Sequence, residues 1–316
     1  MKTAYVTVNV ATVWTKANLP RKQDYYATTA PADIPAWLSG LTHHDRIWFI
    51  DENILQTQVL YGSQVLVTEE SGEWSRVLIP DQFTPKNEQG YPGWIPTRQI
   101  EFHEEYDRVY AAAPSVWVTV PRAQLNTDQK KLELSYLTRL PLLRVKEKRT
   151  HVLLPSGKEG WLANQDVTIR SEAHIAESPC QRAPYPMLQK RKGHDIVEAG
   201  KRFLGLPYLW SGMSSFGYDC SGFSHSMHKA SGILIPRDAS AQYKFGREHG
   251  FEVNKENLKA GDLVYFANER GYVDHVGIYA GDGDFLHASN SNYVVKIQPL
   301  WEGKYLQKFC GAMRFW

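Results

Sequence analysis

The chain has 316 residues, of which 42% are hydrophobic and 22% are charged, so it is long enough to bury the cores of two or three domains. Its 36 lysine and arginine residues nearly balance its 34 aspartate and glutamate residues, and the net charge of +2 supplies no broad field for a nucleic-acid backbone or an anionic membrane. The 3 cysteines are widely separated, which favours neither a disulfide framework nor a paired-cysteine metal site.

The N-terminal stretch, residues 1–14, alternates polar and apolar residues and lacks the continuous apolar core of a signal peptide. No later run of about 20 apolar residues could span a bilayer. We therefore expect a folded cytoplasmic protein, or an exported protein from which a signal has been removed.

Residues up to about 170 show the short alternating patterns of β-strands separated by turns. The segment 31–50 interrupts them, with one helical turn expected at residues 35–38 and a return to strand at residues 48–50. A weak internal repeat follows. Its first copy is Val77-Leu78-Ile79-Pro80 followed by Gly93-Trp94-Ile95, and its second is Val152-Leu153-Leu154-Pro155 followed by Gly160-Trp161-Leu162. The first copy has the longer turn, which contains Gly90-Tyr91-Pro92.

A proline-rich stretch without periodicity predicts a connector at residues 173–190, which includes Cys180. Helical periodicity appears only beyond it. The sequence therefore predicts one β domain at residues 1–104, a second at 105–172 and a mixed α and β domain at 191–316.

The context of Cys220 is the most informative part of the chain. Asp219 is a good helix N-cap, Phe223 and Met227 repeat at helical spacing, and Gly232 is a natural stop, so Cys220 falls in the first turn of a helix. The helix dipole there favours a thiolate by roughly 0.3–1 kcal/mol, which is less than one pKa unit, so a nucleophile would also need an imidazole. The alternative is a small buried hydrophobic residue.

Two downstream strands supply candidate imidazoles. His275 lies in the strand pattern of residues 274–281, a glycine turn follows, and His287 lies in the next pattern at residues 284–289. A tight hairpin can bring these rings together on neighbouring strands. His275 could then take the Cys220 proton while His287 fixes its tautomer.

These blocks, together with Tyr208 and Gly261-Asp262-Leu263, stand in the order and at the spacings of the NlpC-type cell-wall peptidases, which the chain resembles over residues 190–316. The resemblance implies an α+β, papain-like catalytic domain. It implies that Cys220 is the nucleophile, His275 the base and His287 the third polar residue, and that Tyr208 lines the site and assists oxyanion binding.

The two Gly-Trp units resemble bacterial SH3-like domains, so the implied architecture is two small SH3-like β-barrels before the papain-like domain. This architecture resembles the YkfC-type γ-D-glutamyl-L-diamino-acid endopeptidases of murein recycling. Those enzymes act on murein peptides such as L-Ala-γ-D-Glu-diamino acid and require the free amine of L-Ala.

The YkfC-type resemblance also implies substrate-binding roles. Asp219 and Tyr91 would hold the free amine, and Ser221 would bind the γ-D-Glu portion, with Trp210 as an apolar wall. Arg237 and Asp238 match a pocket-lining segment, in which Arg237 would pair with the substrate α-carboxylate. Ala239 stands where serine is expected. The sequence leaves lysine and diaminopimelate open as the diamino acid.

Three alternatives remain open. Cys220, His275 and His287 are legitimate zinc ligands, although a first-turn cysteine with a histidine hairpin favours covalent catalysis without metal or cofactor. The chain could also be a non-catalytic wall-binding protein, or an amidase or hydrolase acting on intact peptidoglycan. No obligate protein partner is indicated. His225 and His228 are expected to face solvent.

Overall fold

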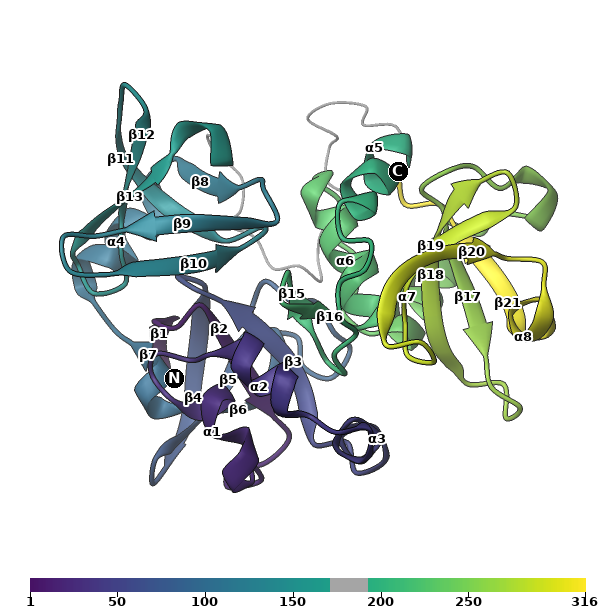
Figure 1. Ribbon diagram of the computed structural model, residues 1–316, viewed down its shortest axis with the longest axis horizontal. Helices are drawn as coiled ribbons and strands as arrows, with labels where there is room; N and C mark the ends of the chain where they lie inside the picture. The colour runs from purple at the N-terminus through teal and green to yellow at the C-terminus, as the bar shows by residue number, and fades with distance from the viewer. Residues whose placement is uncertain (171–192) are drawn as a thin grey trace. The chain divides into compact units, whose positions relative to one another are not determined.

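The computed structural model describes residues 1–170 and 193–316 (Figure 1). The connector predicted at residues 173–190, and Cys180 with it, lies outside the described residues. The chain divides into two compact units. The first contains Met1–Asp81 and also Ser214–Phe216, and the second contains Gln82–Glu88 and Gly217–Trp316. Two short segments thus belong to a different unit from their neighbours in the sequence.

The first unit begins with a 7-stranded antiparallel sheet. In spatial order its strands are β3 (Leu55–Leu60), β2 (Val10–Trp14), β6 (Tyr91–Pro96), β5 (Trp74–Ile79), β4 (Gln64–Ser71), β1 (Lys2–Val6) and β7 (Ile100–Glu101). Alternate residues such as Val13, Val65 and Val77 are fully buried and form its core. The first Gly-Trp unit of the repeat is therefore the β5–β6 hairpin.

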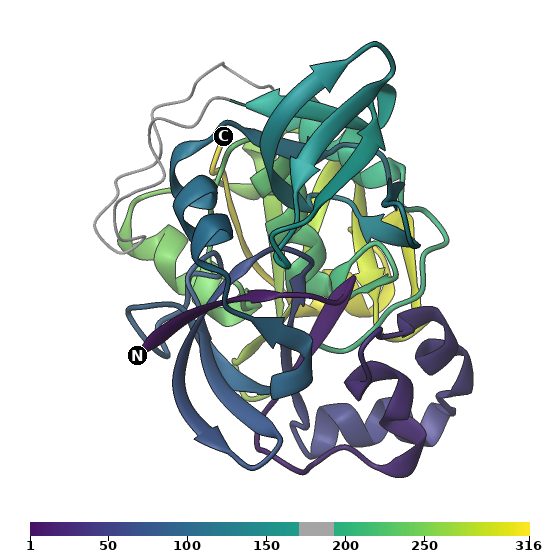
Figure 2. The same ribbon diagram turned by 90° about the vertical axis from the view of Figure 1, so that its left-hand side faces the viewer.

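Three helices separate β2 from β3: α1 (Tyr25–Thr28), α2 (Ile34–Gly40) and α3 (His43–Asp51). They form one cluster beside the first sheet, which Figure 2 shows in purple. The expected return to strand at residues 48–50 was wrong, because these residues lie in α3. Thr42 and Asp45 form a reciprocal capping box that starts this helix, with Asp45 N–H donating to Thr42 Oγ1 at 3.2 Å.

A second 7-stranded sheet follows. Its strands in spatial order are β10 (Lys131–Ser135), β9 (Arg122–Asn126), β13 (Glu159–Ala163), β12 (Arg149–Leu153), β11 (Arg139–Lys146), β8 (Ser115–Val118) and β14 (Val167–Arg170). Numbered from its own first strand, this order is identical to that of the first sheet. The sequence repeat therefore reflects a repeated topology.

Helix α4 (Glu104–Ala112) connects the two sheets and was not predicted from the sequence. Its Tyr106 is fully buried, and the Tyr106 ring meets Tyr5 of β1 edge to face at 4.6 Å between centroids. The Tyr106 hydroxyl donates to the Gly62 carbonyl at 3.0 Å. Most other positions of this helix are exposed, so two buried tyrosines, Tyr106 and Tyr110, hold it in place.

The second unit is α+β, as predicted. Its 5-stranded antiparallel sheet has the order β20 (Val294–Pro299), β19 (Asp284–Ser289), β18 (Val273–Gly281), β17 (Leu263–Ala267) and β21 (Phe309–Met313). Helices α5 (Gly193–Lys201), α6 (Cys220–Ala230) and α7 (Ala239–Glu248) pack on this sheet, as Figure 1 shows. Helix α8 (Gly303–Lys308) precedes β21, and a small hairpin of β15 (Met213–Ser214) and β16 (Gly217–Tyr218) precedes α6.

Within the described ranges, we find no helix that is long and apolar enough to cross a membrane.

Candidate active site

Helix α6 begins at Cys220, and Asp219 is its N-cap as predicted. The Asp219 carboxylate accepts a hydrogen bond from the Gly222 N–H at 2.6 Å, and the helix ends before Gly232, which has a φ of 79°. Gly222 cannot be larger, because a Cβ there would lie 2.2 Å from the Gly212 carbonyl oxygen. The cysteine is thus fixed at the positive end of a buried helix.

Cys220 is buried, and α6 packs against β18 and β19. Burial and the charge of Asp219 raise the pKa of the Cys220 thiol to about 12, while backbone hydrogen bonds from Val276 and Ser221 act in the opposite direction. Because Val276 directly follows His275, the hydrogen bond to its backbone places the sulfur beside the histidine strand. The resting cysteine is a neutral thiol that needs a base.

The two predicted histidines meet on β18 and β19, which form the expected hairpin. His275 Nε2 and His287 Nδ1 are 2.7 Å apart, and both rings are buried. His275 Nδ1 is also buried, and it has no hydrogen-bond partner among the residues that the structure describes. This nitrogen remains available to a thiol proton.

The environment keeps both imidazoles neutral at rest. Burial, followed by the charges of Lys304 and Lys308, lowers the pKa of His275 to about 3. Burial likewise lowers the pKa of His287. Nδ1 of a neutral His287 can accept a hydrogen bond from the N–H that His275 carries at Nε2. In this tautomer of His275 the Nδ1 atom is unprotonated, as a base requires.

Tyr305 of α8 completes this cluster and was not predicted from the sequence. Its ring lies 5.4 Å from the His287 ring and 6.0 Å from the His275 ring, centroid to centroid. The charge of Cys220 contributes to a raised Tyr305 pKa after the larger effect of burial. A lone tyrosine on a short polar helix gives no sequence signal for this position.

Asp219 is part of a buried charge network with Arg237 and Ser221. Arg237 Nη2 donates to Asp219 Oδ2 at 2.6 Å, and Arg237 Nη1 donates to Ser221 Oγ at 2.9 Å. The Arg237 residue is only 1% exposed. The guanidinium expected to meet a substrate carboxylate is therefore buried against Asp219, and it positions that carboxylate next to the nucleophile.

Tyr208 and Trp210 lie in the turn that leads to the β15–β16 hairpin. Burial raises the pKa of Tyr208 well above its ordinary value, and the charges of Cys220 and Asp219 raise it further, so these groups are neighbours of the phenol. Tyr208 thus remains a neutral hydroxyl beside Cys220. The Trp210 Nε1 is buried with no hydrogen-bond partner in the described part of the chain.

Comparison with known proteins identifies the catalytic unit. Residues 205–314 match the NlpC/P60 family, and residues 118–169 match the YKFC SH3b2 domain. The γ-D-glutamyl-L-lysine dipeptidyl-peptidase of Bacillus cereus is 39% identical over 99% of this chain and 90% of that protein. The chain belongs to the NlpC/P60 family.

Two further proteins are similar to the chain over nearly its full length. The γ-D-glutamyl-L-lysine dipeptidyl-peptidase of Bacillus subtilis is 37% identical over 96% of this chain and 96% of that protein. The crystal structure of an NlpC/P60 family protein from Bacillus cereus superposes with a TM-score of 0.91 at 39% identity, covering 99% of both chains. The papain-like unit and the second sheet, an SH3b domain, therefore have the predicted fold.

Asp238 occupies the N-cap position of α7 in the NlpC/P60 unit. Its carboxylate lies 3.1 Å from Lys86 Nζ, and the Phe83 carbonyl accepts a hydrogen bond from the Arg237 N–H at 2.8 Å. The segment Gln82–Glu88 belongs to this same unit. The turn that is longer in the first copy of the repeat thus supports the segment carrying Arg237 and Asp238.

Tyr91 is the first residue of β6, at the end of the longer turn rather than within it. It is 2% exposed and belongs to the core cluster that includes Val77 and Ile95.

His225 and His228 were expected to face solvent, and that expectation was wrong. They are 2% and 0% exposed, and their Nδ1 atoms lie 2.8 Å from the Ile235 carbonyl and 2.9 Å from the Ser224 carbonyl, respectively. Helix α6 is buried over nearly all its length, so polar residues occupy interior positions that an amphipathic pattern assigns to the surface.

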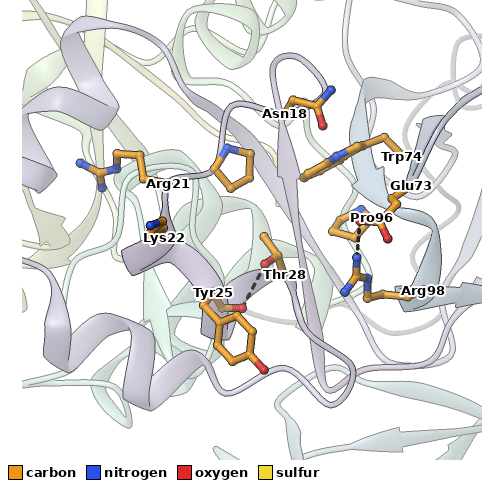
Figure 3. A pocket seen from close by; sticks show the side chains of 10 residues that line it. Asn18, Arg21, Lys22, Tyr25, Thr28, Glu73, Trp74, Pro96 and Arg98 are labelled. Atoms are coloured by element: carbon orange, nitrogen blue, oxygen red, sulfur yellow. Dashed lines mark hydrogen bonds and ion pairs between the residues drawn. The ribbon is translucent and has the colours of Figure 1, made fainter.

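A separate pocket of about 320 Å³ lies within the first unit (Figure 3). Arg98 on its wall pairs with Glu73 at 2.7 Å, and the Trp74 ring and Lys22 also line it. None of the candidate site residues contributes to this pocket.

The zinc alternative gains no support from the geometry. Among the described residues no group of three or more histidine, cysteine, aspartate or glutamate side chains is arranged to hold a metal ion. His275 and His287 instead direct a ring nitrogen at each other.

Proposed function

We propose that this cysteine peptidase hydrolyses the bond between γ-D-glutamate and the diamino acid of murein peptides that carry a free N-terminal L-alanine. One observation carries the proposal. His275, whose Nε2 is hydrogen-bonded to His287, lies beside the cysteine that begins α6. The chain that carries this arrangement is 39% identical, over 99% of its length, to a γ-D-glutamyl-L-lysine dipeptidyl-peptidase.

The first chemical step forms a thioester. His275 Nδ1 takes the proton from Cys220 Sγ, and the sulfur attacks the γ-carbonyl carbon of D-glutamate. The protonated His275 then gives that proton to the leaving α-amine of the diamino acid as the C–N bond breaks. His287 accepts the Nε2 proton of His275 in a hydrogen bond throughout and stabilises the transient imidazolium.

The second step hydrolyses the thioester. His275 Nδ1 takes a proton from water, the hydroxide attacks the acyl carbon, and the sulfur leaves and recovers its proton from His275. Each tetrahedral intermediate carries an oxyanion. The N–H of Cys220, in the first turn of α6, has no acceptor within its own helix, and the neutral Tyr208 hydroxyl lies nearby, so both can donate to it.

The free amino end would be held by Asp219. Its Oδ1 already accepts from Gly222, Ser221 and Arg237, whereas among the described residues Oδ2 accepts one bond, from Arg237 at 2.6 Å. Oδ2 therefore retains a lone pair for the L-alanine ammonium. We assign Ser221, Trp210 and Asp238 to the γ-D-glutamyl pocket, as the family resemblance implies.

We also infer that the first sheet is an SH3-like domain like the second. The identical strand order of the two sheets supports this inference. So does the hairpin that they share, in which a strand containing Gly-Trp pairs with the strand before it.

Cleavage of matched peptides tests the proposal. The protein is incubated with L-Ala-γ-D-Glu-L-Lys, with its N-acetylated form and with intact peptidoglycan, and the products are identified by mass spectrometry. We expect L-Ala-D-Glu and lysine from the free peptide, and cleavage of the acetylated peptide slower by at least about tenfold, because acetylation removes a charge-assisted hydrogen bond. Equal rates on the free and acetylated peptides would refute recognition of the free amino end.

A further inference from the structure

Three lysines gather around the histidine pair. In the antiparallel register of β19 and β20, Lys296 lies directly opposite His287, so the two side chains project from the same face of the sheet. Lys304 and Lys308 come from the short helix α8. Lys304 Nζ lies 5.1 Å from the centroid of the Tyr305 ring, whose packing against both imidazoles is described above.

The pairing of neighbouring strands places Lys308 near the histidine pair. It directly precedes Phe309, which pairs with Phe266 of β17, and Phe266 in turn pairs with His275 of β18. The charges of Lys304 and Lys308 both act on His275, and those of Lys296 and Lys304 act on His287. The three ammonium groups therefore lie around the histidine pair, two of them acting on the base His275 and two on His287.

None of these charges is neutralised by a direct ion pair within the described residues. Lys296 donates to Asn292 Oδ1 at 3.4 Å and Lys304 donates to Ser291 Oγ, and both of these acceptors are neutral. In residues 1–170 and 193–316, no carboxylate oxygen lies within 4.0 Å of any of the three ammonium groups. Asp274 is the acid whose charge interacts with Lys304 and Lys308, and it lies at a register shift of β18 directly before His275.

The reaction mechanism indicates which part of the substrate lies near these lysines. His275 must give its proton to the leaving α-amine, so the leaving diamino acid lies on the His275 side of the sulfur. In a tripeptide the carboxylate of that residue is only two bonds from the amine nitrogen. The leaving residue therefore carries an anionic group close to His275, the ring on which the charges of Lys304 and Lys308 act.

We propose that Lys296, Lys304 and Lys308 form a subsite that binds the carboxylate of the leaving diamino acid. The subsite rests on the proposed function and adds a preference for substrates that end at the diamino acid. Lysine side chains suit this task, because each presents a mobile point charge that can follow the carboxylate as the C–N bond breaks.

The test compares L-Ala-γ-D-Glu-L-Lys with the same peptide carrying a C-terminal carboxamide. We expect wild type to cleave the free acid with about tenfold higher kcat/KM. In the Lys304→Gln, Lys308→Gln double variant the ratio of kcat/KM for the free acid to kcat/KM for the amide should fall toward 1. Lys244→Gln, at an exposed position of α7, is the matched control and should keep the preference.

Two further readouts separate binding from structural damage. A Lys304→Arg, Lys308→Arg variant should restore the preference, because it keeps both charges. The double glutamine variant should also move the acid limb of kcat/KM to higher pH, since the two cations lower the pKa of His275.

Equal cleavage of acid and amide by wild type, or an unchanged preference in the double glutamine variant, would overturn the subsite. Failure of wild type to cleave either peptide would instead refute the proposed function on which the subsite rests.

Discussion

The buried His228 should make the catalytic unit sensitive to acid. Its side chain is fully buried in α6, its Nε2 has no hydrogen-bond partner within the described residues, and its ring meets Phe315 edge to face at 6.2 Å. Burial lowers its pKa from 6.5 to about 4. The unfolded chain therefore protonates His228 near pH 6.5, whereas the native chain protonates it only near pH 4. The stability that comes from burying the neutral ring is present above pH 6.5 and is lost as the pH falls toward 4.

The size of the effect follows from proton linkage. At pH 5 the unfolded imidazole is almost fully protonated and the native one is almost fully neutral, which costs about 2 kcal/mol of stability relative to pH 7.5. His228→Phe removes the titrating group and keeps an aromatic ring of similar size. The unfolding free energy of the variant at pH 7.5 should be within about 1 kcal/mol of that of wild type. The loss of one hydrogen bond to Ser224 is offset by the removal of one buried nitrogen without a partner.

Urea unfolding at pH 7.5 and pH 5 measures the difference. The loss of unfolding free energy between the two pH values should be smaller by about 2 kcal/mol in His228→Phe than in wild type. His194→Gln, at a side chain that is 69% exposed, is the control and should leave the loss unchanged. Equal losses in wild type and His228→Phe would refute the argument from burial.

Two predictions concern the charges around the nucleophile. Arg237→Ala leaves Asp219 buried without its partner and should lower the unfolding free energy of the unit by about 3–5 kcal/mol in urea titrations. Combining Arg237→Leu with Asp219→Asn should recover part of this loss. A loss below about 1 kcal/mol in Arg237→Ala would contradict the role of the pair. Because the pKa of His275 is lowered from 6.5, wild type should retain most of its kcat/KM at pH 5.5, where a base with the ordinary value would retain about one tenth, and a limb at or above pH 6.5 would contradict the neutral resting pair.

The catalytic residues were predictable because their signals are local. An aspartate cap fixed the start of α6 at Cys220, and strand alternation with a glycine turn placed His275 and His287 on one hairpin. Both patterns depend on short stretches of chain.

The features that escaped prediction depend on burial by distant segments. Helix α4 is held by two tyrosines against residues from other elements, and α6 buries polar side chains that would normally face water. The partner of Asp219 is likewise distant, because Arg237 follows 18 positions later in the chain. This ion pair could therefore be assigned only from the fold.

The central claim is that Cys220 carries the γ-D-glutamyl group as a thioester. Rapid acid quenching during turnover of L-Ala-γ-D-Glu-L-Lys, followed by mass spectrometry of the intact protein and its peptides, measures this directly. We predict an adduct of the mass of L-Ala-D-Glu minus water on the peptide that contains Cys220, and neither adduct nor cleavage in Cys220→Ala. Cleavage at an undiminished rate by Cys220→Ala would contradict the account.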